Sequence, residues 1–339
     1  MASALAALLN GRARKVTPAV VRALRDALPG STILVSEDLD QARRHVRELI
    51  RQRPDVVLSG GGDGAAVRLL NLWREGGGRE LPTLGILRLG TGNAWARGVG
   101  APKFSSHVRK LSRLNGEALP VRAVTLVEVE DHLCPFAGVG WDARILNDYQ
   151  SNLEKRLAQP VGGRLASWLH KGARGYLYSV ARITVPGEWM RLRREGQARV
   201  ALDNLGPEVF RVVDGKPAPC HGSTTLHEGP VSVGAASSVR EWGYGLRAFP
   251  FAGLQPGFIN VRIYQGHVLD GVLNAAKLWR GREVPGMYDW FATAVRMRFS
   301  RPMPFQIGGD PMGERTEIVL CAAPERVRVV DWRAAFATN

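Results

Sequence analysis

The run Ser-Gly-Gly-Gly-Asp-Gly at residues 59–64 directly follows the apolar run Val56-Val57-Leu58. A buried strand that ends in consecutive glycines before a helix presents bare backbone N–H groups at the helix N-terminus. Such groups bind phosphate, because they point outward and the helix dipole favours negative charge. Glycine also removes the side chains that would block a close approach. The run therefore predicts a phosphate-binding loop, with a tight turn that binds no ligand as the alternative.

A second glycine loop follows the next predicted strand. The apolar run Leu84–Leu87 leads into Gly90, Thr91, Gly92 and Asn93. In open α/β sheets, ligands bind at the carboxyl ends of the strands. Two polar glycine loops at neighbouring strand ends are harder to explain as turns alone, so the pair favours a nucleotide site.

One acidic residue, Asp63, stands inside the first glycine loop. A carboxylate among glycines that surround a phosphate is not suited to binding an anion. We therefore predict that Asp63 holds a cation or accepts the proton of a hydroxyl group. The alternative is a turn aspartate that caps the following helix.

Length and composition predict a globular protein with two domains. The chain has 339 residues, of which 45% are hydrophobic. No apolar run approaches the roughly 20 residues of a membrane span. Three scattered cysteines indicate reduced thiols in a cytosolic protein without a metal-binding spacing. The net charge of +15 favours anionic partners such as nucleotides or acidic lipids. No nucleic-acid-binding motif is present, so we expect no nucleic-acid partner.

The chain divides at about residue 122. Before it, strand and helix patterns alternate, which is typical of a parallel sheet covered by helices. After it, short strands separated by turns indicate an antiparallel, sandwich-like domain, interrupted by two basic helices at 145–158 and 163–176. The predicted strands of this second part are 124–129, 133–139, 178–185, 199–202, 209–213, 231–235, 258–264, 294–299, 305–307 and 317–321.

Four blocks of the sequence resemble the diacylglycerol kinase catalytic family, which includes bacterial lipid kinases and sphingosine kinases and is related to NAD kinases. The blocks lie in order and at family-like spacing along nearly the whole chain. They are Leu8-Leu9-Asn10, Gly61-Gly62-Asp63-Gly64, Leu89-Gly90-Thr91-Gly92-Asn93 and the segment 137–143, Ala-Gly-Val-Gly-Trp-Asp-Ala.

The resemblance implies an α/β nucleotide-binding domain over residues 1–122, completed by 323–339, and a β-rich acceptor domain over 123–322. It implies that the last strand, 327–330, returns to the first domain. It also implies transfer of the γ-phosphate of ATP to a lipid hydroxyl, with ATP and Mg²⁺ as cofactors. The sequence leaves the acceptor open among diacylglycerol, a sphingoid base, phosphatidylglycerol and a non-lipid alcohol.

The site residues follow from these motifs. Asp63 and Asp310 are the predicted catalytic residues, Asp310 is the candidate metal ligand, and Asp142 is the candidate for binding the acceptor hydroxyl. The alternatives are a β-turn role for Asp310 before Pro311 and a surface position for Asp142. The predicted nucleotide-binding residues are Asn10, Arg12, Lys15, Gly60, Gly61, Gly62, Gly64, Gly90, Thr91, Gly92 and Asn93.

The chain departs from the family pattern at several of these positions. Ala65 stands where the family usually has Thr, Arg68 where it has Glu, and Ala94 where it has Asp. Near the C-terminus, Gly308-Gly309-Asp310 replaces the family's Asp-Gly-Glu. Phosphoryl transfer depends on the positioning of the reacting groups and on a cation that bridges the phosphates. The missing carboxylates therefore weaken the case for catalysis more than the case for nucleotide binding.

Three functions remain open at this stage. The first is an ATP-dependent lipid kinase in the cytoplasm that docks on the inner face of the membrane, with Trp168, Lys171 and Arg174 as a candidate contact. The second is a kinase-impaired relative that binds nucleotide or lipid. The third is a dinucleotide-binding oxidoreductase, because residues 60–65 formally fit G-x-G-x-x-A.

Overall fold

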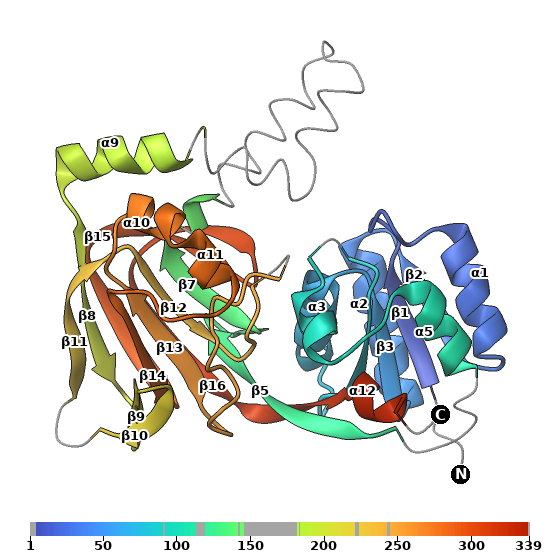
Figure 1. Ribbon diagram of the computed structural model, residues 1–339. Coiled ribbons are helices and arrows are strands. Elements are labelled where there is room, and N and C mark those ends of the chain that lie inside the picture. Colours follow the sequence, from blue (N-terminus) through green and yellow to red (C-terminus); the bar gives the residue numbers. More distant parts are fainter. Residues whose placement is uncertain are drawn as a thin grey trace. The chain divides into compact units, whose positions relative to one another are not determined.

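The computed structural model describes residues 5–90, 92–112, 119–141, 143–145, 182, 184–220, 224–242 and 245–337. The chain forms two compact units, which are coloured along the sequence in Figure 1. The first consists of Met1–Leu126 with Ala323–Asn339, and the second of Val127–Ala322. The chain passes between them in two long strands, β5 (Val121–Val129) and β16 (Asp310–Val330).

The first unit is built on a parallel sheet with the strand order β4-β3-β1-β2. Its strands are β1 (Leu5–Asn10), β2 (Thr32–Ser36), β3 (Val56–Gly60) and β4 (Thr83–Leu87). All residues of β3 and β4 are buried, as expected for central strands covered on both faces. The end of β16 pairs in parallel with β4, Val329 opposite Leu84. This confirms that the last strand returns to the first unit.

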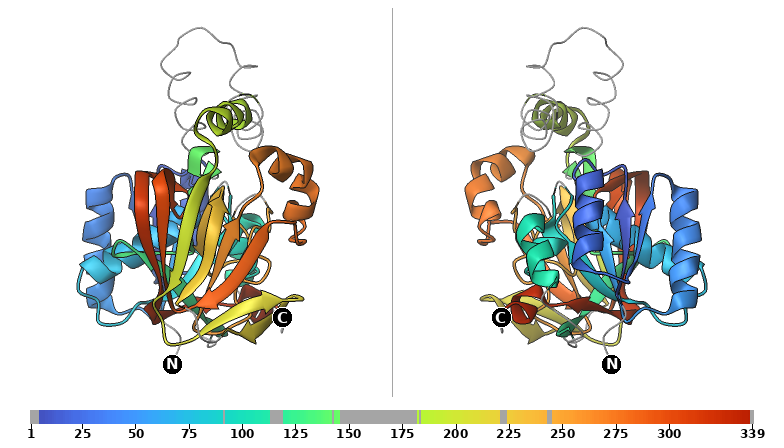
Figure 2. Two further views of the ribbon diagram at one scale, coloured as in Figure 1. Left: turned by 90° about the vertical axis from the view of Figure 1, so that its left-hand side faces the viewer. Right: turned by 90° about the vertical axis from the view of Figure 1, so that its right-hand side faces the viewer.

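Helices cover both faces of this sheet. α1 and α5 contact each other on one side, and α2 and α3 contact each other on the other (Figures 1 and 2). Thr17 caps α1, as predicted, by accepting a hydrogen bond from Val20 N. Asp38 caps α2 at 2.7 Å from Gln41 N. The helices are α1 (Pro18–Ala27), α2 (Leu39–Gln52), α3 (Asp63–Glu75), α4 (Ala94–Gly98), α5 (Phe104–Leu111) and α12 (Trp332–Ala335).

The second unit is antiparallel and rich in strands, as predicted. Its main strand path runs β10-β9-β14-β13-β12-β7-β15-β16, and β8 joins β15 to β11. The strands are β6 (His132–Cys134), β7 (Phe136–Gly140), β8 (Ala198–Asn204), β9 (Val209–Val213), β10 (Lys216–Pro219), β11 (Thr225–Val231), β12 (Val233–Ser237), β13 (Ile259–Tyr264), β14 (Met287–Ala292) and β15 (Ala294–Ile307). Its helices are α9 (Val185–Glu195), α10 (Val268–Leu273) and α11 (Ala275–Trp279).

Several predicted boundaries in this unit are wrong. The predicted strand 178–185 ends in a helix, because Val185 begins α9 and Pro186 occupies a first-turn position that favours a helix start. The predicted strand 133–139 is split at Pro135 into β6 and β7. The segments 294–299 and 305–307 form one bulged strand, β15. Most of the predicted helices 145–158 and 163–176, together with Trp168, Lys171 and Arg174, lies outside the described residues.

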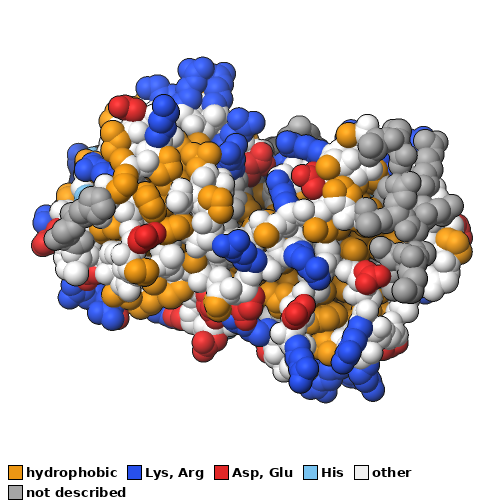
Figure 3. All heavy atoms as spheres, turned by 90° about the horizontal axis from the view of Figure 1, so that it is seen from below, with side chains coloured by type: hydrophobic (Ala, Val, Ile, Leu, Met, Phe, Trp, Pro, Cys, Tyr) orange, Lys and Arg blue, Asp and Glu red, His pale blue; other side chains and the backbone are white. Residues whose placement is uncertain are grey.

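The surface carries its positive charge in several places. On the face shown in Figure 3, Lys and Arg side chains lie in separate groups between apolar and acidic ones. The net charge of +15 therefore does not by itself mark one binding face. None of the helices in the described part of the chain is long and apolar enough to cross a membrane.

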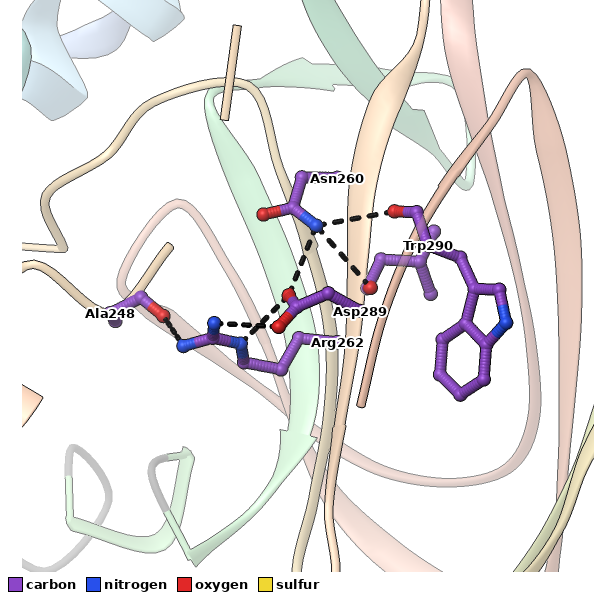
Figure 4. Close-up of polar contacts among 6 residues, drawn as sticks. Ala248, Asn260, Arg262, Asp289 and Trp290 are labelled. Carbon is purple, nitrogen blue, oxygen red and sulfur yellow. Dashed lines mark hydrogen bonds and ion pairs between the residues drawn. The ribbon is translucent and has the colours of Figure 1, made fainter. Parts of the chain in front are cut away.

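A buried ion pair holds the middle of the second unit together (Figure 4). Arg262 and Asp289 lie opposite each other on β13 and β14, with side-chain exposures of 6% and 7%. Two hydrogen bonds join them, from Nη2 to Oδ2 at 2.7 Å and from Nε to Oδ1 at 2.9 Å. Asn260 also donates to Asp289, at 3.1 Å, and Arg262 donates to the carbonyl of Ala248. The pair therefore fixes a loop as well as two strands.

We expect Arg262→Met to lower the free energy of unfolding by about 3–5 kcal/mol, because it leaves the Asp289 carboxylate buried without its partner. The matched control is Arg298→Met, which breaks an ion pair with Asp203 in which the arginine is 56% exposed. This exposed pair contributes about 0–1 kcal/mol. Denaturant unfolding of both variants measures the difference. Equal losses would show that the Arg262 pair is not a stabilising centre.

Candidate functional site

Three loops of the first unit meet at one edge of the parallel sheet. They follow β1, β3 and β4, which are neighbours in the sheet. Leu9 pairs with Gly60, and Gly60 pairs with Leu87, so the three strands end at the same level. The two glycine loops predicted from the sequence are therefore adjacent, and the loop after β1 lies beside them.

The two glycine loops touch through their backbones. A Cβ atom added to Gly90 would lie 2.3 Å from the Cα atom of Gly62 and 2.8 Å from the carbonyl oxygen of Gly61. A Cβ atom at Gly62 would lie 3.3 Å from the Cα atom of Gly90. Any side chain at Gly90 would therefore push the loops apart. These glycines are needed for loop-to-loop packing.

Two side chains fasten the second loop. Asn93 is buried in a left-handed conformation, with φ of 51°. Its Oδ1 accepts from Gly90 N at 2.8 Å, and its Nδ2 donates to Gly90 O at 2.6 Å. Lys15, from the loop after β1, donates through Nζ to the same carbonyl at 2.8 Å. The side chain of Asn93 thus sets the loop shape, while its predicted contact with nucleotide stays a prediction.

Asp63 joins the first glycine loop to the helix that follows the second. Its Oδ2 accepts from Ala94 N at 2.7 Å, and its Oδ1 accepts from Trp95 N at 3.1 Å. The carboxylate therefore caps α4, a different helix from its own. The sequence-based alternative, a cap on the helix that Asp63 itself begins, is wrong, because the N-cap residue of α3 is Gly62 and no side chain caps that helix.

Two opposing effects act on the pKa of the Asp63 carboxyl group. Burial raises the pKa of the Asp63 carboxyl above its ordinary value. The N–H groups at the start of α4 and the positive charge of Arg97 counter this rise in pKa. Arg97 itself donates to Gly92 O at 2.6 Å. The sequence analysis did not predict a role for Arg97. Its position four residues after Asn93, one helical turn away, was the available signal that it could reach back to the glycine loop.

The N-terminus of α3 has no side-chain cap. Its N-cap residue is Gly62, which has no side chain to accept a hydrogen bond. The first N–H groups of any α-helix have no acceptor within the helix. At Gly64, an added Cβ atom would meet no described residue outside its own helix turn within 4 Å. Ala65 N and Ala66 N already donate to Gly62 O, at 3.0 and 3.3 Å, so the N–H groups of Asp63 and Gly64 are the candidate phosphate donors at this open position.

Two further predicted residues, Asn10 and Arg12, lie at the end of β1 and in the loop that follows it. Asn10 lies beside Gly61, where a Cβ atom would come within 3.2 Å of Asn10 Cβ. Asn10 Oδ1 accepts from the backbone of Arg12 at 3.1 Å, and the Arg12 residue is exposed. Thr91 and Asp142 lie outside the described residues. The predicted roles of all four stay predictions.

The other predicted carboxylate, Asp310, lies in the second unit. It begins β16 and pairs with Ile307 across a two-residue hairpin turn. The turn residues Gly308 and Gly309 have φ of 61° and 97°. Two positive φ values in a two-residue loop match the type I′ turn, which accepts Gly-Gly or Asp-Gly. The hairpin therefore explains the glycines, and the turn alternative for Asp310 gains support.

The described residues do not form a metal site made of protein groups alone. They contain no cluster of three or more His, Cys, Asp or Glu side chains that could hold a metal ion. Both oxygens of Asp63 already accept amide hydrogens.

Known proteins with similar sequences agree with this picture. Residues 8–126 match the model of the diacylglycerol kinase catalytic domain. Lipid kinase YegS of Escherichia coli K12 is 22% identical over 328 residues, which are 95% of this chain and 94% of that protein. The probable lipid kinase YegS-like of Enterobacter sp. strain 638 is 24% identical over 320 residues, 92% of this chain and 91% of that protein.

Solved structures show the same fold at low identity. A putative diacylglycerol kinase from Bacillus anthracis matches with a TM-score of 0.61 and 13% identity, over 98% of both chains. An NAD kinase from Archaeoglobus fulgidus, solved in complex with ATP, matches with a TM-score of 0.51 and 13% identity, over 98% of this chain and 96% of that one. The resemblance read from the sequence is therefore confirmed: the chain has the fold of these kinases, and its residues 8–126 match the diacylglycerol kinase catalytic domain.

Proposed function

We propose that this protein is an ATP-dependent kinase that transfers the γ-phosphate to the hydroxyl group of a lipid. The observation that carries the proposal is the meeting of three loops at one sheet edge, beside an uncapped helix N-terminus. The relatives named lipid kinases and the structural neighbour solved with ATP support the same function. An assay with γ-labelled ATP, Mg²⁺ and a panel of lipids tests it directly.

In this proposal the ATP phosphates bind at the first turn of α3 and along the two glycine loops. Lys15 brings positive charge to Gly90, and Asn93 holds the loop in shape. Mg²⁺ would accompany ATP, since it is usually held by phosphate oxygens together with one or two carboxylates. Asp310 stays the proposed protein ligand of Mg²⁺, and Asp142 the proposed contact of the acceptor.

The cellular part of the proposal is peripheral association with an anionic membrane from the cytoplasmic side. The net charge of +15 supports attraction to anionic lipid headgroups. A second candidate function, a kinase-impaired binding protein, is favoured by the absence of carboxylates at Ala94 and Gly308.

The dinucleotide-binding alternative is disfavoured, because the glycine loop follows β3 instead of the first strand.

Gly64→Val should strongly weaken phosphate binding without disturbing the fold. Side chains of a helix tilt toward its N-terminus, so the valine would occupy the space in front of the free amides. Losing charge-assisted hydrogen bonds of about 1.5–3 kcal/mol each should weaken ATP binding roughly 10-fold to 100-fold per bond. Calorimetric titration with ATP measures this effect. Gly98→Val, at another helix position where the added Cβ meets no described neighbour within 4 Å, is the matched control.

Gly62→Val tests the same site less specifically, because two effects would change ATP binding at once. Its side chain would press on Gly90, so lost binding would mix blocked phosphate with separated loops. If Gly64→Val binds ATP as tightly as the wild type and as Gly98→Val, the phosphate site is not at the start of α3.

Asp63→Asn should lower turnover at saturating ATP by about two to four orders of magnitude, the usual scale for an acid–base group. It should also lower stability by about 1 kcal/mol, because an amide can accept only one of the two hydrogen bonds from α4. Steady-state kinetics and denaturant unfolding measure the two effects separately. Asp38→Asn, which alters a carboxylate cap on α2, calibrates the structural part. A stability loss with turnover nearly intact would make Asp63 a positioning residue only.

Gly308→Asp should raise turnover if the missing carboxylate limits catalysis. Asp-Gly suits a type I′ turn, and the nearest described atom beyond the chain neighbours of residue 308 is Cys134 Cβ, 3.9 Å from the added Cβ. A gain of about tenfold or more is expected from a group of this kind. Gly308→Asn keeps the shape without the charge and serves as the control. Equal rates for both variants and the wild type would show that this position does not limit the reaction.

A further inference from the structure

A small cavity lies behind α9 in the second unit. Three α9 residues face it, namely Glu188, Arg191 and Leu192. Opposite them are the end of β7 with Trp141, then Arg144, and Arg301 of β15. The cavity measures about 40 Å³, which is room for a few water molecules or one small oxyanion.

The chain reaches this cavity through a strained turn. Gly140, at the end of β7, has φ of 127°, a conformation that side chains disfavour. A Cβ atom there would lie 2.1 Å from the carbonyl oxygen of Ser232. Only glycine fits, and it leads directly into Trp141, whose backbone N–H donates to the same Ser232 oxygen at 3.2 Å. The wall of the cavity is therefore fixed by the backbone.

Positive charge exceeds negative charge around the cavity. Three arginines line it against one carboxylate, Glu188. Glu188 forms an ion pair with Arg144. Arg301 pairs with Glu195 at 3.2 Å and donates to the carbonyl of Gly196 at 2.8 Å, which closes the end of α9. For Arg191, the described residues provide no ion pair. Partly buried charge without a partner is unfavourable, so the cavity suits an anion.

One uncharged polar group in the cavity wall also favours an anion. The indole N–H of Trp141 is buried and has no hydrogen-bond acceptor among the described residues. The amide group of Gln197 uses its nitrogen to donate to Ser232 Oγ at 3.0 Å and Gln265 O at 2.5 Å. These bonds occupy the Gln197 nitrogen, so the donors for an anion are the Trp141 indole and the excess guanidinium groups, which match phosphate oxygens because these only accept.

The opposite face of α9 is apolar and exposed. Trp189 is 39% exposed and Met190 is 50% exposed, and the guanidinium of Arg193 lies 3.9 Å from the centre of the Trp189 ring. α10 contacts α9 and adds Leu273, which is 83% exposed. Figure 1 shows α9, α10 and α11 at the same end of this unit. Exposed apolar side chains among arginines are typical of surfaces that meet a bilayer.

We propose that the α9 cavity binds the phosphate of an anionic lipid headgroup while Trp189, Met190 and Leu273 contact the surrounding bilayer. A free oxyanion would need only the cavity, whereas a phospholipid in a membrane uses both faces of the helix. Membrane contact then belongs to the second unit, whereas the glycine loops belong to the first. The inference adds to the proposed kinase function but does not depend on it, because it concerns binding without ATP.

The test is sedimentation of the full-length protein with vesicles in the absence of ATP. One set of vesicles contains phosphatidylcholine only, and the other contains phosphatidylcholine mixed with phosphatidylglycerol. Arg191→Gln removes a charge inside the cavity, and Arg194→Gln removes one from an exposed position on the same helix. Arg194→Gln should weaken binding to anionic vesicles by no more than about fivefold, the usual effect of one basic residue near a membrane. Arg191→Gln should weaken it by about tenfold or more, because it also loses hydrogen bonds.

Two further measurements distinguish a lipid site from a site for any small anion. Leu273→Ser should weaken binding to anionic vesicles, and soluble inorganic phosphate should compete only weakly. Unfolding midpoints close to that of the wild type show that the variants fold. Equal losses for Arg191→Gln and Arg194→Gln would overturn the cavity assignment. Equal binding to neutral vesicles, or tight binding of inorganic phosphate with no vesicle binding, would overturn the lipid assignment.

Discussion

The candidate site depends on the direct backbone contact between Gly62 and Gly90. No side chain separates the two loops, so the carboxylate of Asp63 can reach the first N–H groups of α4. A methyl group at Gly90 would lie 2.3 Å from the Cα atom of Gly62 and would force the loops apart. Lys15 and Asn93 then secure the same carbonyl and amide of Gly90. The geometry of three loops therefore follows from the absence of two Cβ atoms.

Helix capping explains where an anion would find free donors. Within the first unit, α1 and α2 are capped by the side chains of Thr17 and Asp38. α3 begins with an acidic residue, yet the carboxylate of Asp63 is bonded to α4. No side chain caps α3, so the N–H groups of Asp63 and Gly64 are left for a ligand. A phosphate group would take the place that a capping side chain has in the neighbouring helices.

The sequence predicted the first unit better than the second, for physical reasons. In a parallel α/β unit each strand and helix has its own local period, so residues 56–64 could be assigned as strand, loop and helix. The partner of Asp63 could not be predicted, because it lies on a helix 31 residues later in the chain. In the second unit, the β-branched run before Pro186 suggested a strand, although it leads into α9. The cavity behind α9 joins elements far apart in sequence, and no local pattern indicates it.

The fold constrains the two positions that lack the family's carboxylates, 308 and 94, in different ways. At Gly308, the type I′ turn accepts Asp-Gly as readily as Gly-Gly, so the hairpin itself does not exclude an acidic residue. At Ala94, the residue is 3% exposed and its N–H is already bonded to Asp63. A carboxylate at this buried position would need hydrogen-bond donors of its own to remain ionised. The described structure therefore accepts an acidic residue more readily at position 308 than at position 94.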